Sequence, residues 1–270
     1  MPSAEAPIAS LSELCIGYQS GLGRHQAVRN VGLTLEPGEV LGVAGESGSG
    51  KTSIGLAMMG LLPPGASISG SIEFRGQEMV GASEKAWRGI RGRTVAMVFQ
   101  ETTTALNPVF RIGDQMTAVF RSNLGVSKAD ARARVADALR RVELTDVDRV
   151  MASHPSELSG GMCQRVVIAM AVGCGSQVLI ADEPTSALDV CVQKDVLDLL
   201  AHLVSLERLA VLLISHDLSV LDRMCDRLMI MNGGEVVEAG PTADVITAPQ
   251  HSYTRALLES VPRLSAEKLA

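Results

Sequence analysis

The sequence contains few aromatic side chains, carries no excess of basic charge and has no apolar run long enough to cross a membrane. Phe, Trp and Tyr make up 3% of its 270 residues, so Leu, Val, Ile, Ala and Met must fill the core. The net charge of −6 provides no basic footprint for nucleic acid, and we expect no nucleic-acid partner. The longest uncharged stretch, residues 166–181, is too short for a transmembrane helix and is interrupted by glycines. The sequence therefore predicts a chain that does not span a membrane by itself.

The cysteines form neither a disulfide framework nor a zinc motif. They are odd in number and widely separated, and no two are arranged as C-x-x-C. Residues 1–7 also lack the basic start and apolar run of a secretory signal. The scattered cysteines make a reducing cytoplasm the simplest prediction for the location of the chain. The five cysteines are Cys15, Cys163, Cys174, Cys191 and Cys225.

Apolar strands and helices alternate along much of the chain. Residues 8–38 mix short apolar pieces with turn signals, which is typical of a hairpin-like β region. Alternation of strand and helix in the remainder predicts a parallel sheet with helices on both faces. Strands are expected at residues 40–44, 71–74, 95–99, 178–181 and 210–215, and helices from residue 51 to before 63 and at 128–144, 164–172 and 192–206.

Residues 45–52 fit the pattern G-x-x-x-x-G-K-[ST], between an expected strand and an expected helix. Its glycines let backbone N–H groups turn toward phosphate oxygens, and the following helix adds the positive end of its dipole. Lys51 supplies a charge for the β- and γ-phosphates, and the Thr52 hydroxyl can ligate Mg²⁺. The alternative, a glycine turn with a chance lysine, does not account for the strand and helix on either side. The expected nucleotide contacts of this phosphate loop are Gly45, Glu46, Ser47, Gly48, Ser49, Gly50, Lys51, Thr52 and Ser53.

A second motif is the apolar strand at residues 178–181, which runs into two carboxylates. Asp182 is placed to hold Mg²⁺, and Glu183 could polarise the attacking water as a general base. On its own this is a weak signal, because many strands end in a solvated acidic turn. The phosphate loop upstream favours the functional interpretation.

Residues 158–165, with the sequence LSGGMCQR, resemble the ABC ATPase signature LSGGxxQR, and the resemblance extends over nearly the whole chain. Ser159, Gly160 and Gly161 would form an exposed helix N-terminus with free N–H groups, a second anion site. The structural alternative is an ordinary helix cap without a ligand. The position of the motif shortly before Glu183 follows the arrangement of that family.

The resemblance to ABC ATPases implies roles for several further residues. Gln100 matches the glutamine that touches Mg²⁺ and water, and His216 matches the histidine that contacts the γ-phosphate. Residues 186–189, with Asp189, match the loop that crosses the dimer interface. Tyr18 lies where the family places an aromatic ring on adenine, although a lone Tyr near a strand is more often part of a core. By this likeness Glu183, His216 and Gln100 are catalytic, and Thr52, Gln100 and Asp182 hold the metal.

The same resemblance implies an α/β fold and a shared active site. We expect a P-loop NTPase core with a parallel sheet, an antiparallel β subdomain and an inserted α-helical subdomain. The single nucleotide-binding domain covers residues 1–270, with a core at 1–100 and 160–240, a helical subdomain at about 101–159 and a tail at 241–270. Two cassettes pair head to tail, so Ser159 and Gly161 serve an ATP held by the partner. Closure around ATP would drive membrane subunits that this chain lacks.

Three segments resemble the peptide/nickel/opine importer branch of ABC ATPases: residues 99–108, the GGM variant followed by IAMA, and residues 251–258. The resemblance implies a second, non-identical ATPase subunit, two membrane permease subunits, an extracytoplasmic solute-binding protein and a peripheral position on the cytoplasmic face of the inner membrane. The chain departs from the branch at Glu101-Thr102, where Asp-Pro is common, and at Cys163, where a basic residue is common. The short tail after residues 251–258, which stops at Ala270, is more similar to that of nickel or metallophore members.

Two other functions fit the sequence less well. A soluble ABC ATPase of DNA repair or translation would usually carry coiled-coil or zinc insertions or a second cassette, and none is evident in the sequence. A regulatory cassette that cannot hydrolyse ATP is disfavoured because Lys51, Asp182, Glu183 and His216 are all present.

Overall fold

The computed structural model describes residues 6–20, 23–100, 105–186 and 188–260. Its centre is a six-stranded sheet in the order β10-β9-β3-β8-β7-β6, in which β10 pairs antiparallel to β9 and the other neighbours are parallel. The central strands are buried on both faces, which explains why their sequences are continuous apolar runs. In sheet order the strands are Glu235–Pro241, Arg227–Asn232, Val40–Ala44, Ala210–Ile214, Val178–Asp182 and Val95–Val98.

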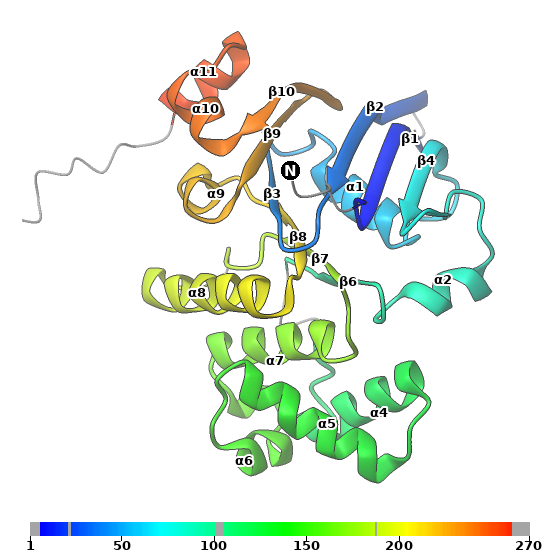
Figure 1. Cartoon of the computed structure of the whole chain (residues 1–270), viewed down its shortest axis with the longest axis vertical. Coiled ribbons are helices and arrows are strands. Elements are labelled where there is room, and N and C mark those ends of the chain that lie inside the picture. The colour runs from blue at the N-terminus through cyan, green and yellow to red at the C-terminus, as the bar shows by residue number, and fades with distance from the viewer. Residues whose placement is uncertain (1–5, 21–22, 101–104, 187, 261–270) are drawn as a thin grey trace, which may run out of the picture.

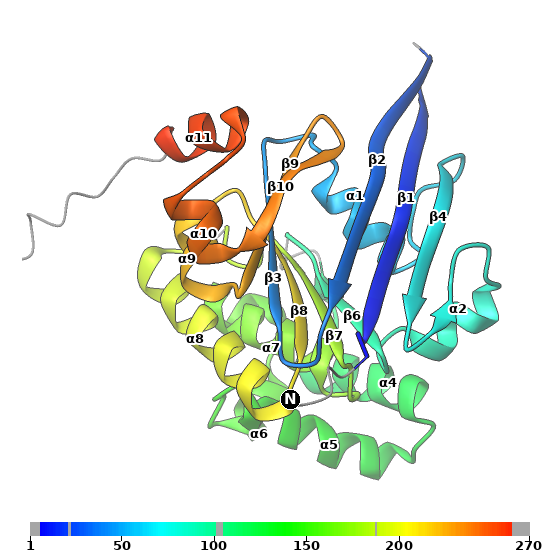
Figure 2. The ribbon, with the colours of Figure 1, turned by 45° about the horizontal axis from the view of Figure 1, so that its top comes forward.

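A second, antiparallel sheet has the order β2-β1-β4-β5. Its strands β1, β2 and β4 lie side by side in Figure 2. The expected hairpin-like region is confirmed, because β1 and β2 pair antiparallel from Ala9↔Leu35 to Ser20↔Gly23. In sheet order the strands are Gly23–Leu35, Ala9–Ser20, Ser67–Phe74 and Gln77–Glu78.

The pleat of the six-stranded sheet divides the interior into two apolar cores. Val178 and Ile180 of β7 face one core, and Leu179 and Ala181 face the other. The first core lies between this sheet, α1 (Lys51–Met58) and the antiparallel sheet. One face of the six-stranded sheet is therefore covered by helices only, and the other face is covered by α1 together with the second sheet. This is the α/β arrangement that the family resemblance implied.

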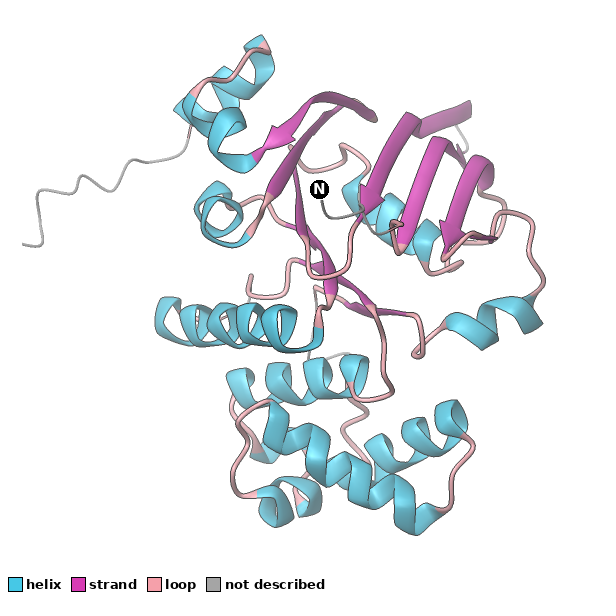
Figure 3. Ribbon diagram, in the orientation of Figure 1, coloured by secondary structure: helices cyan, strands magenta, loops and turns pink. Residues whose placement is uncertain are grey.

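The second core joins the sheet to helices that form one end of the molecule (Figures 1 and 3). Helix α7 contacts both β6 and α5, so it links the sheet to the helical layer. The boundaries expected for a helical subdomain at 101 and 159 stay a prediction, and residues 101–104 lie outside the described part. Besides α1, the helices whose bounds lie within the described residues are α2 (Glu84–Ile90), α4 (Ile112–Leu124), α5 (Lys128–Arg141), α6 (Val147–Ala152), α7 (Gly160–Val172), α8 (Val190–Glu207), α9 (Leu218–Met224), α10 (Thr242–Thr247) and α11 (Ser252–Glu259), with a 3₁₀ turn at Pro155–Glu157.

Two helices begin earlier than the expected residues 164 and 192, and their N-terminal caps explain the difference. Helix α7 begins at Gly160 because the Ser159 hydroxyl accepts the N–H of Met162, and α8 begins at Val190 because Asp189 accepts the N–H groups of Cys191 and Val192. Over the described residues, none of the helices has the length and apolar character needed to cross a membrane.

Candidate functional site

The phosphate loop connects the carboxyl end of β3 to α1, and its conformation depends on glycine. Gly45, Gly48 and Gly50 have φ values of 148°, 81° and 101°, a region that other residues rarely adopt. At Gly50 a Cβ atom would also lie 2.3 Å from the carbonyl oxygen of Ala27 on β2. The loop thus packs closely against the antiparallel sheet at Gly50, and its backbone conformation is strained for any residue other than glycine.

Lys51 is buried at the start of α1, and its ammonium is held by the loop itself. Nζ donates to the carbonyl oxygens of Gly45 at 2.7 Å and Glu46 at 2.8 Å, and lies 3.3 Å from Ser49 Oγ. Burial lowers the pKa of Lys51, and the nearby carboxylates of Glu183, Asp182 and Glu46 act in the opposite direction. Gly45, Glu46 and Ser49 therefore fix the position of the lysine ammonium.

Asp182, the last residue of β7, faces the start of α1. Burial raises the pKa of its carboxyl, while a hydrogen bond from the Thr52 hydroxyl acts in the opposite direction. Asp182, Thr52 and Gln100 line one pocket, and the carboxylate, hydroxyl and amide oxygens that these residue types carry suit a hard cation. Among the described residues no three His, Cys, Asp or Glu side chains cluster as a metal site. This donor set fits Mg²⁺, which commonly uses one or two carboxylates together with water and substrate phosphates.

Glu183 and His216 lie against one another at the ends of β7 and β8. Glu183 Oε1 accepts the backbone N–H of His216 at 2.8 Å and lies 2.6 Å from its Nδ1. The Ser215 hydroxyl lies 3.4 Å from the other carboxylate oxygen. Glu183 has a left-handed backbone, with φ 50°, and its side chain is only 12% exposed. The carboxylate is thereby held in one orientation.

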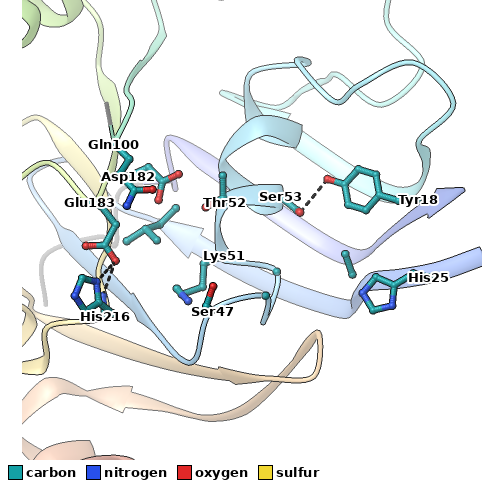
Figure 4. A pocket seen from close by; sticks show the side chains of 14 residues that line it. Tyr18, His25, Ser47, Lys51, Thr52, Ser53, Gln100, Asp182, Glu183 and His216 are labelled. Atoms are coloured by element: carbon teal, nitrogen blue, oxygen red, sulfur yellow. Dashed lines mark hydrogen bonds and ion pairs between the residues drawn. The ribbon is translucent and has the colours of Figure 1, made fainter. Parts of the chain in front are cut away.

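These residues line a pocket of about 410 Å³ (Figure 4). Tyr18 lies at the far side from Glu183, and its hydroxyl donates to Ser53 Oγ at 2.9 Å. His25 is a lining residue that sequence reasoning missed; its position depends on the pairing Tyr18↔His25 within the β1–β2 hairpin. The full lining is Tyr18, His25, Ala27, Ser47, Gly48, Gly50, Lys51, Thr52, Ser53, Gln100, Asp182, Glu183, Ile214 and His216.

The predicted contacts at Ser159, Gly160, Gly161 and Asp189 are not among these lining residues. They gather instead where the N-termini of α7 and α8 meet. A Cβ atom on Gly161 would lie 2.4 Å from Val192 Cγ1, and one on Gly160 would lie 3.5 Å from Leu188. Ser159 and Gly160 are exposed. Ala187, in the loop expected to cross a dimer interface, lies outside the described residues.

Comparison with known proteins identifies the family. Residues 28–186 match the family model described as ABC transporter, and residues 237–270 match that of the oligopeptide/dipeptide transporter C-terminal region. The chain is 45% identical over 258 residues, 95% of its length and 79% of the relative's, to the probable D,D-dipeptide transport ATP-binding protein DdpD of Escherichia coli. It is 39% identical over 266 residues, 98% of its length and 79% of the relative's, to the oligopeptide transport ATP-binding protein OppD of Salmonella typhimurium.

Solved structures agree with this relationship. A dimeric ATP-binding cassette, MJ0796, in a post-hydrolysis state bound to ADP and Pi superposes with a TM-score of 0.75 at 25% identity, covering 87% of this chain and 98% of that one. The cassette cbiO1 from Clostridium perfringens gives the same TM-score and identity, covering 89% and 91%. The chain therefore belongs to the ATP-binding subunits of ABC transporters, as an ATPase that powers import and carries the C-terminal region of the oligopeptide/dipeptide branch.

Proposed function

We propose that the pocket of Figure 4 binds ATP together with Mg²⁺ and hydrolyses it, with each residue acting where the pocket places it. The observation that carries the proposal is the convergence of separate segments on one cavity: the phosphate loop, the end of β7, Gln100 and His216. Tyr18 would stack on adenine, and Lys51 would exchange its carbonyl partners for β- and γ-phosphate oxygens. Thr52, Asp182 and Gln100 would hold Mg²⁺, which neutralises phosphate charge when bound.

In this proposal Glu183 accepts the proton of the water that attacks the γ-phosphorus. Its carboxylate already receives the backbone N–H of His216, which fixes its direction. The His216 side chain is 69% exposed and its Nδ1 lies 2.6 Å from the same carboxylate, so Nε2 is the ring nitrogen that would contact a γ-phosphate. A buried lysine and a fixed carboxylate reduce the reorganisation needed at the moment of reaction.

The test is Glu183→Gln, which keeps the side-chain shape and removes the proton acceptor. ATP should bind with unchanged Kd, while turnover in the assembled complex falls by about 10²- to 10⁴-fold. Asp217→Asn is a matched control, because Asp217 caps α9 outside the pocket and Asn caps equally well. Turnover near that of the wild type would remove Glu183 from the role of base.

We further propose that this chain contributes half of each working site. Ser159 and Gly160 are exposed at the N-terminus of the thirteen-residue helix α7, away from the pocket, where they would meet a nucleotide held by another cassette. The similar cassette MJ0796, whose structure is a dimer bound to ADP and Pi, supports the pairing of two cassettes. The second ATPase is expected to be a non-identical chain, as the GGM and IAMA variants suggest.

We propose a dipeptide or oligopeptide as the cargo, delivered by a binding protein to two permease subunits, with this chain on the cytoplasmic face of the membrane. The match of residues 237–270 and the relatives named for dipeptide and oligopeptide transport favour peptides over the nickel or metallophore cargo that the tail suggested. Neither the matched families nor these relatives support a soluble ATPase of DNA repair or translation.

The cargo test is to isolate the intact membrane complex through this chain and identify its subunits and the binding protein's ligand by mass spectrometry. Peptides in the ligand fraction, and ATP-dependent uptake of the same peptides into proteoliposomes, are expected. A nickel chelate in their place would contradict the peptide proposal while leaving the ATPase assignment intact.

A further inference from the structure

The C-terminal helix α11 touches the phosphate loop through one side chain. The hydroxyl of Tyr253 accepts the backbone N–H of Glu46 at 3.1 Å, although the two residues are 207 positions apart in the chain. Glu46 follows Gly45 in the loop, outside the pocket lining. The sequence likeness of residues 251–258 to the importer branch did not suggest any contact with the nucleotide site.

The helix that carries Tyr253 is firmly anchored. On β10, the Glu238 carboxylate accepts the N–H groups of Gln250 at 2.7 Å and His251 at 3.0 Å. His251 Nδ1 in turn accepts the N–H of Tyr253 at 3.2 Å and caps α11. Tyr253 and Leu257 also pack against the larger apolar core. The hydroxyl is therefore held in place before nucleotide arrives, so the contact requires little ordering of the tyrosine.

The bonded N–H belongs to the same peptide group as the carbonyl that holds Lys51. Lys51 Nζ donates to Gly45 O at 2.7 Å, and Tyr253 receives Glu46 N–H, so the 45–46 peptide is held at both of its polar ends. In a trans peptide the C=O and N–H point in opposite directions, and fixing one end fixes the other. Gly45 could otherwise reorient easily because it has no side chain.

We propose that Tyr253 is a positioning residue of the ATP site: it holds the 45–46 peptide so that Lys51 is presented to the phosphates, and through this one side chain it connects α11 to the phosphate loop. The inference rests on the proposed role of the phosphate loop. When Lys51 leaves Gly45 O for the phosphates, the tyrosine still fixes the peptide. The C-terminal region shared with oligopeptide and dipeptide transporters thereby contacts the loop that senses ATP.

The test compares ATP binding by Tyr253→Phe, which keeps the ring and removes only the hydroxyl, with that by Ser252→Ala, which removes an exposed hydroxyl from the same helix. Loss of one neutral hydrogen bond should raise the Kd for ATP by about two- to tenfold in Tyr253→Phe. Ser252→Ala should bind like the wild type. In the assembled complex, the KM for ATP should rise by the same factor while kcat is unchanged.

A double-mutant cycle separates positioning from simple packing. If Tyr253 acts through Lys51, Tyr253→Phe should weaken binding less in a Lys51→Ala background than in the wild type. An equal effect in both backgrounds, or an unchanged Kd with a lower melting temperature of the nucleotide-free protein, would overturn the proposal. If Lys51→Ala alone bound ATP like the wild type, the proposed nucleotide site itself would be wrong.

Discussion

Replacing Gly50 by alanine probes how tightly the phosphate loop is held, and Gly48→Ala provides a matched comparison in the same loop. Both glycines have positive φ, 101° and 81°, so alanine at either position adds backbone strain of about 1–2 kcal/mol. Only at Gly50 does the new methyl meet other atoms. Its Cβ would lie 2.3 Å from the Ala27 carbonyl oxygen, whereas at Gly48 nothing lies within 4 Å.

The contact at Gly50 adds a second cost, because the clashing atom belongs to the backbone of β2 and cannot rotate away. Overpacking of this kind typically destabilises by about 1–3 kcal/mol. Gly50→Ala should therefore lower the free energy of unfolding by about 2–5 kcal/mol, and Gly48→Ala by about 1–2 kcal/mol. Urea unfolding of the nucleotide-free protein measures both. Equal destabilisation by the two substitutions would refute the close approach of the loop to β2.

Three further predictions concern other parts of the chain. Ser159→Ala removes the cap of α7 and should lower the free energy of unfolding by about 1 kcal/mol. ATP binding by this chain should stay intact, while ATP turnover in the paired complex falls. Normal turnover in the paired complex would show that Ser159 has no part in catalysis. Burial opposes ionisation of Glu238, but the N–H of Gln250, the Thr254 hydroxyl, the N–H of His251 and the charge of His251 together outweigh it and hold the pKa of the carboxyl below its ordinary value of 4.5. The ionised form therefore stabilises the fold at neutral pH, and this contribution is lost as pH falls below 4.5 through the lowered pKa. The melting temperatures of Glu238→Gln and the wild type should differ at neutral pH and converge in acid. Burial raises the pKa of the thiols of Cys163, Cys174 and Cys225, whereas Cys191 is exposed. Thiol labelling of the folded protein should therefore modify Cys191 fastest. Faster labelling of Cys225 would contradict its burial in the core.

The sequence predicted those features that depend on neighbours along the chain. The pattern G-x-x-x-x-G-K-[ST] between a strand and a helix predicts a phosphate-binding loop. Strands 178–181 and 210–215 in one parallel sheet must place Asp182, Glu183 and His216 at the same edge. The pocket lining agrees with that expectation.

Features that depend on strand register or on distant docking were not predictable in this way. His25 enters the pocket lining beside Tyr18 only because the irregular β1–β2 ladder pairs these two residues. Tyr253 reaches Glu46 only because Glu238 on β10 fixes the turn before α11. Ser159 and Asp189 have local roles as helix caps, which a motif comparison does not separate from a role toward a partner's nucleotide.

The central claim is that this chain holds ATP but supplies half of a working site. Its most direct test is the ATP turnover of the purified chain, shown by light scattering to be monomeric, compared with that of the complex with its second ATPase and permeases. We expect the monomer to bind ATP with little turnover, and turnover to appear on assembly. Full turnover by the isolated monomer would contradict it.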